Sequence, residues 1–120
     1  MSERSKILVV DDEAVPRRLV ALTLRPYADV ITVSNGYEAI EILERRRLDL
    51  LISDGFMPGM SGTQLIERAI RMYPEMPCLM VSGNIDDERV KWLNEVNVPY
   101  LAKPWRVDEL VTIVKRLLAV

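Results

Sequence analysis

Residues 7–12 read Ile-Leu-Val-Val-Asp-Asp, four apolar residues followed directly by two carboxylates. Three later stretches repeat this arrangement of a short apolar run that ends in a polar residue. They occupy residues 50–54, 78–82 and 99–104 and end in Asp54, Ser82 and Lys103-Pro104. Continuous apolar runs of this length are typical of parallel strands that are buried on both faces. The four stretches therefore predict buried strands, each with polar chemistry at its carboxyl end.

Segments with the period of an amphipathic helix separate these strands. We expect helices at about residues 14–24, 36 onward, 61 or 62 to 72, 86–96 and 107 onward, and a further strand at 30–33. The first helix places Val15, Leu19 and Leu22 on one stripe. A strand followed by a helix, five times over, predicts an α/β fold in which helices cover both faces of a five-stranded parallel sheet.

The composition is that of one ordinary domain. The chain has 120 residues, 49% of them apolar, which is enough to bury a core. Its net charge of -2 argues against direct binding to nucleic acid. We find no long apolar span and no signal-peptide pattern, and so expect no membrane association. The lone Cys78 lies in an apolar run and is expected to be an inert core residue, which fits a reducing cytoplasm.

The chain contains no histidine. This excludes Ser-His-Asp and Cys-His catalysis, zinc sites with imidazole ligands, and phosphohistidine on this chain. Metal ligands must then be oxygen atoms, which favour a hard cation such as Mg²⁺ or Mn²⁺.

The polar strand ends are expected to converge, because open parallel sheets bind ligands at the carboxyl edge where the strand order reverses. Asp11, Asp12 and Asp54 would repel one another unless a cation lay among them or some were protonated. Ser82 and Lys103 add a hydroxyl and an ammonium group. Taken alone, the first two acids also fit a solvated helix N-terminus. The complete set instead predicts a divalent-metal and phosphoryl site.

In this order and at these spacings, the motifs resemble the receiver domain of two-component response regulators of the chemotaxis type. The resemblance covers residues 6–119 and rests on Asp11-Asp12, on Asp54 with the Met-Pro-Gly at 57–59, on Ser82 and on Lys103-Pro104. It implies a single receiver domain, residues 1–120, with a doubly wound, flavodoxin-like (βα)5 fold and strand order 2-1-3-4-5.

The resemblance also implies roles for the site residues. Asp54 would accept a phosphoryl group from the phosphohistidine of a histidine kinase or a histidine phosphotransfer protein. Asp12 and Asp54 would bind Mg²⁺ directly, the backbone carbonyl of Phe56 would be a third ligand, and Asp11 would act through water. Lys103 would hold the Asp54 carboxylate and supply positive charge during transfer.

Further roles concern switching. Ser82 would donate its hydroxyl to the phosphoryl group. Tyr100 would change rotamer as the loop after Ser82 moves inward; the alternative is an ordinary half-buried strand aromatic. Output is expected through the face formed by the fourth helix, the last strand and the last helix. This face would control an output domain or partner, and a homodimer formed on phosphorylation is a further expectation.

Several positions depart from the family pattern. Gly55 follows the nucleophile where an aliphatic residue is common, which predicts a looser loop. Phe56 and Asn84 occupy the positions at which family members tune hydrolysis of the acyl phosphate. Because Phe56 would hinder in-line attack by water, we expect slow self-dephosphorylation. Trp92 is expected either to face solvent as part of a partner surface or to lie partly buried against the last helix.

Two other functions are alternatives to this one. A Mg²⁺-dependent phosphatase would need a second acid two residues after the nucleophile, where Phe56 stands. A binding module that has lost phosphorylation is disfavoured by the retained Asp54, Ser82 and Lys103. We therefore expect no enzyme acting on an external substrate, only self-phosphorylation and self-dephosphorylation. Met1 favours a stand-alone regulator or the first domain of a longer chain over the C-terminal receiver of a hybrid kinase. An output domain would be lost or would lie in the same full-length chain.

Overall fold

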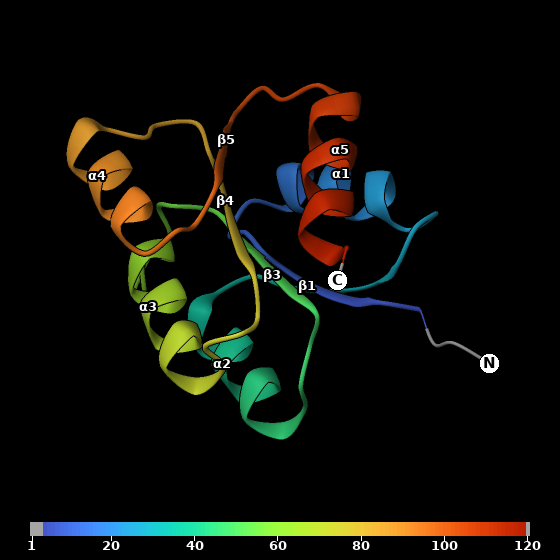
Figure 1. The fold of residues 1–120 in the computed structure, drawn as a ribbon, viewed down its shortest axis with the longest axis horizontal. Coiled ribbons are helices and arrows are strands. Elements are labelled where there is room, and N and C mark those ends of the chain that lie inside the picture. The colour runs from blue at the N-terminus through green and yellow to red at the C-terminus, as the bar shows by residue number, and fades with distance from the viewer. Residues whose placement is uncertain (1–3, 120) are drawn as a thin grey trace.

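The computed structural model describes residues 4–119, in which strands and helices alternate (Figure 1). The strands are β1 (Lys6–Val10), β2 (Asp29–Val33), β3 (Leu50–Ser53), β4 (Cys78–Ser82) and β5 (Tyr100–Ala102). The helices are α1 (Ala14–Leu24), α2 (Gly36–Arg45), α3 (Gly62–Met72), α4 (Asp87–Glu95) and α5 (Val107–Leu118). Each element coincides with a predicted one to within about two residues, the usual uncertainty of an element boundary.

All five strands are parallel and form one sheet in the order β2-β1-β3-β4-β5. This confirms the expected doubly wound topology. The order reverses between β1 and β3, where Val10 pairs with Ser53 at the carboxyl ends of the two strands. The crevice that such folds use for ligands therefore opens beside Asp11 and Asp54.

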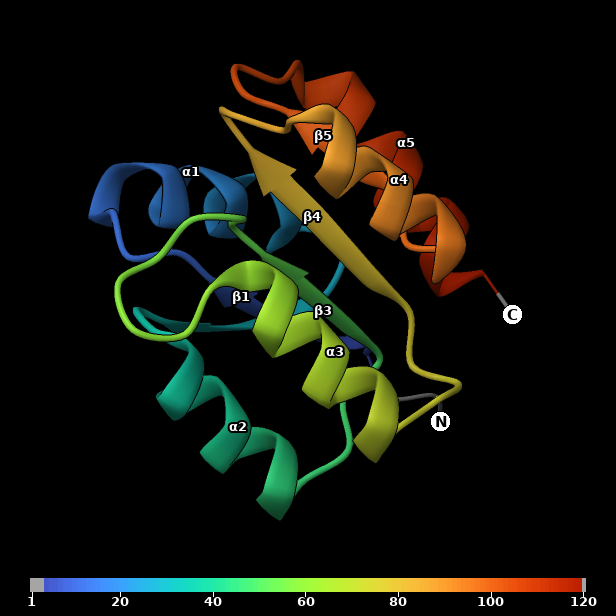
Figure 2. The same ribbon diagram turned by 90° about the vertical axis from the view of Figure 1, so that its left-hand side faces the viewer.

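Alternate strand residues supply two separate cores, because successive side chains of a strand point to opposite faces. On β1, Leu8 and Val10 face α2, α3 and α4, whereas Ile7 and Val9 face α1 and α5. Figures 1 and 2 show the same division, with α1 and α5 on one face of the sheet and the other three helices on the opposite face. Burial on both faces explains why the central strands are continuously apolar.

Side-chain caps fix where three helices begin. The side chain of Asn35 accepts a hydrogen bond from the backbone of Glu38 at the start of α2. Ser61 and Gln64 form a reciprocal capping box on α3, and Asp86 caps α4. Each such cap contributes roughly 1 kcal/mol. The last two caps hold in place the loops that follow β3 and β4, both of which lie at the carboxyl edge of the sheet.

The apolar stripe predicted on α1 is not the buried face of that helix. Val15, Leu19 and Leu22 are 67%, 52% and 61% exposed. The residues of α1 that are buried instead are Val20, Ala21 and Leu24. At about 100° per residue, the buried residues lie on the opposite side of the helix, about 180° from the stripe. Both faces of α1 are apolar, so periodicity alone did not identify the one that packs on the sheet.

Trp92 differs from both of its expected placements. It is partly buried against the core beneath α2, α3 and α4, and it lines a groove with Ser61 and Thr63 of the α3 start. Trp92 does not belong to the core on the other face of the sheet, to which α5 contributes Leu110 and Val114. No helix among residues 4–119 has the length and apolar character needed to cross a membrane.

Candidate phosphoryl and metal site

Backbone hydrogen bonds between neighbouring strands continue past the carboxyl ends of the strands and so position the polar residues that follow. The backbone N–H of Asp54 donates to the carbonyl of Val10 at 2.9 Å. That of Lys103 donates to the carbonyl of Ser82 at 3.0 Å. The polar residues that follow four different strands are thereby held at one edge of the sheet, as the sequence predicted.

Three carboxylates meet at this edge. Oxygen atoms of Asp11, Asp12 and Asp54 lie within 4.8 Å of one another. Asp11 and Asp54 are only 4% and 8% exposed, whereas Asp12 is exposed to solvent. Closely spaced carboxylates with one open side suit a hard cation that keeps several waters, such as Mg²⁺. The donor set of these residues therefore fits the expected metal.

Lys103 reaches into the cluster from the end of β5. Its Nζ lies 2.9 Å from Oδ2 of Asp11 and 3.3 Å from Oδ1 of Asp54, and it donates a hydrogen bond to each. Asp11 also accepts a bond from the backbone N–H of Glu13 at 3.0 Å. One ammonium group thus faces three carboxylates, which leaves the site with an excess of negative charge.

The pKa of Asp54 is raised above its ordinary value, because burial disfavours the charged form. Lys103 lowers that pKa and Asp11 raises it further, so that the ammonium only partly offsets burial. Burial alone would lower the pKa of Lys103, but the hydrogen bond and charge of Asp11, with the charge of Asp54, raise it. Lys103 therefore stays protonated, and added positive charge would stabilise the Asp54 carboxylate.

The loop after Asp54 is closely packed, which corrects the expectation that Gly55 loosens it. Gly55 is buried, and a Cβ built there would lie 3.0 Å from Oγ of Ser82 and 3.2 Å from Sδ of Met80. Its carbonyl accepts a hydrogen bond from the N–H of Gly62 at 3.0 Å. Glycine here allows the loop to approach β4 rather than making it more mobile.

The remaining predicted residues lie around the cluster. Ser82 is buried at the end of β4, and its Oγ accepts a hydrogen bond from the backbone of Asn84 at 3.4 Å. Asn84 itself is exposed. Phe56 is 45% exposed and its ring stacks on Arg89 of α4. Tyr100 begins β5 with its side chain partly exposed, and no described contact joins it to the carboxylates.

Two arginines contribute contacts that sequence reasoning missed. Arg17, on α1, donates from Nη1 to the carbonyl of Asp11 at 2.8 Å and steadies the loop that holds the first acids. A cation one helical turn after an acid pair could have suggested this contact. Arg89 gave no such signal, because its ring partner lies 33 positions earlier in the chain.

Comparison with known proteins agrees with this geometry. Residues 7–115 match the family model of the response regulator receiver domain. The hydrogenase transcriptional regulatory protein HoxA of Bradyrhizobium diazoefficiens is 33% identical over 96% of this chain and 24% of its own length. The DNA-binding transcriptional regulator NtrC of Escherichia coli K12 is 31% identical over 98% of this chain and 25% of its own. The chain thus spans about a quarter of the length of these relatives.

Solved structures give the same result. The signal receiver domain of an HD domain-containing protein from Pseudomonas fluorescens Pf-5 superimposes with a TM-score of 0.90 at 29% identity, covering 97% of this chain and 95% of that one. The BeF3-activated DrrB receiver domain gives a TM-score of 0.88 at 26% identity, covering 96% and 97%. The chain belongs to the response regulator receiver domain family, the phosphoacceptor modules of two-component signalling. Receivers of this family bind Mg²⁺ through acidic residues and act with histidine kinases and output domains.

Proposed function

We propose that Asp54 is the phosphoacceptor of this receiver and that it takes its phosphoryl group from the phosphohistidine of a histidine kinase or a histidine phosphotransfer protein. The observation that carries this proposal is the position of Lys103, whose ammonium group bonds to both Asp54 and Asp11 at the sheet switch point. A carboxylate oxygen of Asp54 attacks phosphorus, and the phosphorus–nitrogen bond breaks. When the other ring nitrogen of the phosphohistidine carries a proton, the leaving group is neutral imidazole and the product is an acyl phosphate, so no general base is required.

The site residues support the expected metal roles. Asp12 and Asp54 would hold Mg²⁺ or Mn²⁺ directly, with the Phe56 carbonyl as a third ligand and Asp11 acting through water. A bound Mg²⁺ supplies positive charge to the oxygens of the transferring phosphoryl group. Lys103 supplies a second positive charge from the carboxyl end of β5. Burial of Asp11 and Asp54 strengthens both interactions, because water screens them less.

The exposed stripe of α1, formed by Val15, Leu19 and Leu22, supports docking of a protein phosphodonor. The helix begins two residues after Asp12, so a partner bound to it would lie beside the acidic cluster. Exposed apolar side chains gathered on one face commonly mark an interaction surface. A donor bound there could present its phosphohistidine to Asp54.

Switching would begin at Ser82, whose hydroxyl would donate to the new phosphoryl group. Tyr100 would then change rotamer, and the face of α4, β5 and α5 would signal to an output domain in a longer chain or to a separate partner. The Tyr100 side chain is 39% exposed, so it is not fixed by core packing, which supports this role. We also propose that the protein forms a homodimer when it is phosphorylated and that it is located in the cytoplasm.

The alternative functions lack supporting contacts. A phosphatase acting on external substrates needs an acid two residues after its nucleophile, and Phe56 fills that position with an aromatic ring stacked on Arg89. A module that only binds would not require one lysine to bridge Asp11 and Asp54. We therefore propose a signalling module whose only reactions are on itself.

Intact mass after incubation with acetyl phosphate tests the proposal, with and without Mg²⁺. The wild type, Asp54→Asn and the control Asp49→Asn are compared; Asp49 is an exposed acid near the opposite edge of the sheet. One phosphate is expected on the wild type and on Asp49→Asn, only with Mg²⁺, and none on Asp54→Asn. A phosphate retained by Asp54→Asn would disprove the assignment of the nucleophile. If no sample gains phosphate, absence of beryllofluoride binding would exclude phosphorylation altogether.

A further inference from the structure

Beside the acidic site, Phe56 stacks against Arg89. The guanidinium carbon of Arg89 lies 3.9 Å from the centre of the Phe56 ring. The other cation–ring contacts of the described residues are longer, at 4.6 and 5.8 Å. A planar guanidinium at this distance gains both electrostatic attraction and dispersion from the ring face. The contact joins the loop after β3 to helix α4.

Arg89 is held at both ends. Its Nε donates to Oγ1 of Thr63, in the first turn of α3, at 3.2 Å. Its backbone N–H donates to Oδ1 of Asp86, the cap of α4, at 2.8 Å. Although three acids directly precede it in the chain, its side chain forms no ion pair with any residue from 4 to 119. The charge of Arg89 is directed at the Phe56 ring instead.

The contact connects two segments that the proposed function moves relative to each other. Phe56 lies in a loop fixed by the hydrogen bond between Gly55 and Gly62. Arg89 lies in the first turn of α4, which residues 83–86 connect directly to Ser82. If the Ser82 hydroxyl turns toward a phosphoryl group, as the proposed function requires, this short connection would transmit the movement to α4, while the hydrogen bond of Gly55 would hold the Phe56 loop. The stack would then belong to the unphosphorylated arrangement.

One nitrogen atom of the Arg89 guanidinium lacks a hydrogen bond in this arrangement. Nη1 is buried without a hydrogen-bond partner, and it is the only side-chain nitrogen or oxygen atom in residues 4–119 found in this condition. A buried donor without a partner raises the free energy of the state that contains it. When Arg89 leaves the ring, Nη1 gains hydrogen bonds to water. The missing hydrogen bond therefore lowers the free-energy cost of breaking the stack.

We propose that Phe56 and Arg89 form a latch that holds α4 in its unphosphorylated position, so that Arg89 determines how readily phosphorylation of Asp54 moves that helix. The inference rests on the proposed function and adds a regulatory residue to it. Arg89 touches no reacting atom and is a positioning residue. Weakening a contact made only in the resting state raises the population of the switched state, and raises by the same factor the affinity of a ligand that selects it.

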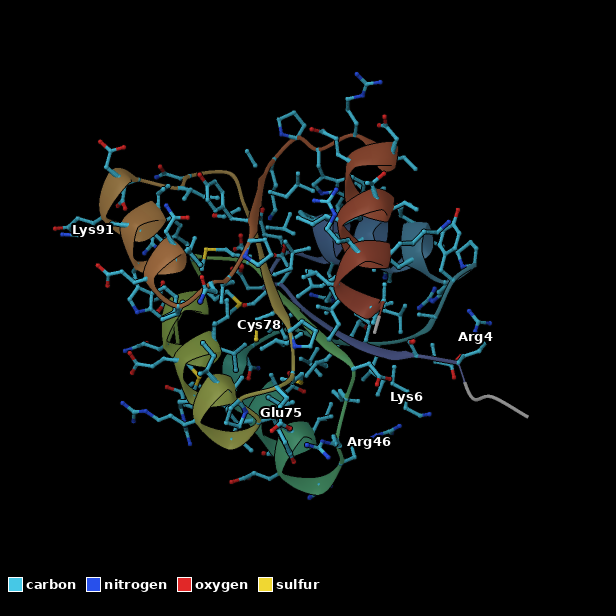
Figure 3. The ribbon with its side chains drawn as sticks, in the orientation of Figure 1. Arg4, Lys6, Arg46, Glu75, Cys78 and Lys91 are labelled. Carbon is cyan, nitrogen blue, oxygen red and sulfur yellow. The ribbon has the colours of Figure 1, made fainter. Side chains whose placement is uncertain are left out.

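Titration with beryllofluoride and Mg²⁺, a phosphoryl mimic, tests the latch through the amide NMR signals of α4. The variants are Arg89→Ala and Lys91→Ala, which removes a positive charge from an exposed side chain of the same helix (Figure 3). Arg89→Ala is expected to bind the mimic about three- to tenfold more tightly, from the usual strength of a cation–ring contact. Lys91→Ala should bind as the wild type does. Without ligand, the Arg89→Ala signals should move toward their positions in the liganded wild type.

Two further variants separate the parts of the latch. Arg89→Lys keeps the charge but loses the planar stack and the bond to Thr63, and its affinity should lie between those of the wild type and Arg89→Ala. Phe56→Leu removes the ring from the other side and should match Arg89→Ala, which keeps the test available if one variant folds poorly.

The outcomes distinguish failure of the proposed latch from failure of the proposed phosphoacceptor function. Equal or weaker affinity in folded Arg89→Ala and Phe56→Leu would overturn the latch and leave the proposed phosphoacceptor intact. Failure of the wild type itself to bind beryllofluoride would overturn the phosphoacceptor, and the latch with it. Tighter binding by Lys91→Ala as well would trace the effect to the net charge of α4 and overturn the latch.

Discussion

A Cβ atom on Gly62 would lie 1.9 Å from the carbonyl oxygen of Asp54. The first turn of α3 therefore rests directly on the peptide group that carries the proposed phosphoacceptor. The N–H of Gly62 also donates to the carbonyl of Gly55 at 3.0 Å, which joins the helix to the next peptide of the loop. Because the close neighbour is backbone, no side-chain rotation can make room.

We predict that Gly62→Ala destabilises the protein by about 3 kcal/mol or more, at or above the upper end of the usual cost of overpacking. Gly83→Ala is the matched control, because a Cβ there would meet only Cβ of Lys103 at 3.9 Å, an ordinary contact. The control should change stability by no more than about 0.5 kcal/mol. Urea unfolding of the three proteins measures both values. Equal midpoints for Gly62→Ala and the wild type would show that α3 can shift away from Asp54.

Replacing Lys103 should tighten Mg²⁺ binding while slowing phosphorylation. The ammonium group and the divalent cation attract the same carboxylates, so Lys103→Met removes a competitor from beside Asp11 and Asp54. We expect an affinity gain of about tenfold, or about 1.4 kcal/mol. That is a fraction of the roughly 4 kcal/mol between unit charges 4 Å apart at an effective dielectric constant of 20. Calorimetric titration with Mg²⁺ measures it, with Lys91→Met as the control. Unchanged or weaker binding would mean that Lys103 does not compete with the metal.

The stripe of α1 should matter for protein donors and not for small ones. Leu19→Ser and Leu22→Ser alter exposed side chains, so each should change stability by only about 0.5 kcal/mol. Transfer from a phosphorylated histidine-containing partner should fall about tenfold, because such variants remove apolar contact area from the interface. Labelling by acetyl phosphate, which is too small to use this surface, should be unaffected. Loss of both activities together would place the defect in the acidic site instead.

Cys78 provides a test of burial and of pH dependence. Burial raises the pKa of its thiol to about 12. We expect no reaction with a thiol reagent at about pH 8 in the native state and rapid reaction once urea unfolds the chain, because only the thiolate reacts. The unfolded thiol ionises first, so this group lowers stability as the pH rises above 9.0 toward about 12. Cys78→Ala should abolish the reaction in urea. Rapid labelling of the native protein would show that β4 opens readily.

Local sequence signals were sufficient for the strands and for the acidic cluster. A polar residue directly follows each apolar run. Because the strands are parallel, their pairing alone brings these polar residues to one edge of the sheet. The chain positions of Asp11, Asp54 and Lys103 therefore predicted their convergence, and the hydrogen bonds of Lys103 confirm it.

Contacts set by tertiary packing could not be predicted in this way. Leu19 and Val20 are neighbours in an apolar helix, and only the approach of α1 to the sheet decides that Val20 is buried and Leu19 is exposed. Gly55 read as a source of mobility because its packing against Ser82 depends on a strand that begins 23 residues later. The stack of Phe56 on Arg89 likewise depends on how α4 lies beside α3.

The lifetime of the acyl phosphate is expected to depend on Phe56. Its ring follows Asp54 by two residues, and the hydrogen bond between Gly62 and Gly55 holds the loop that carries it, so the ring stays beside the site when Arg89 moves away. Phe56→Asn replaces this ring with a smaller polar group that can hold an attacking water, and the lifetime should fall by roughly tenfold, the effect of about 1.4 kcal/mol on a barrier. The decay of phosphorylated protein after removal of acetyl phosphate measures it, with Phe56→Leu separating loss of the ring from gain of a polar group. A lifetime no shorter in Phe56→Asn than in the wild type would show that water reaches the acyl phosphate by a path that Phe56 does not obstruct.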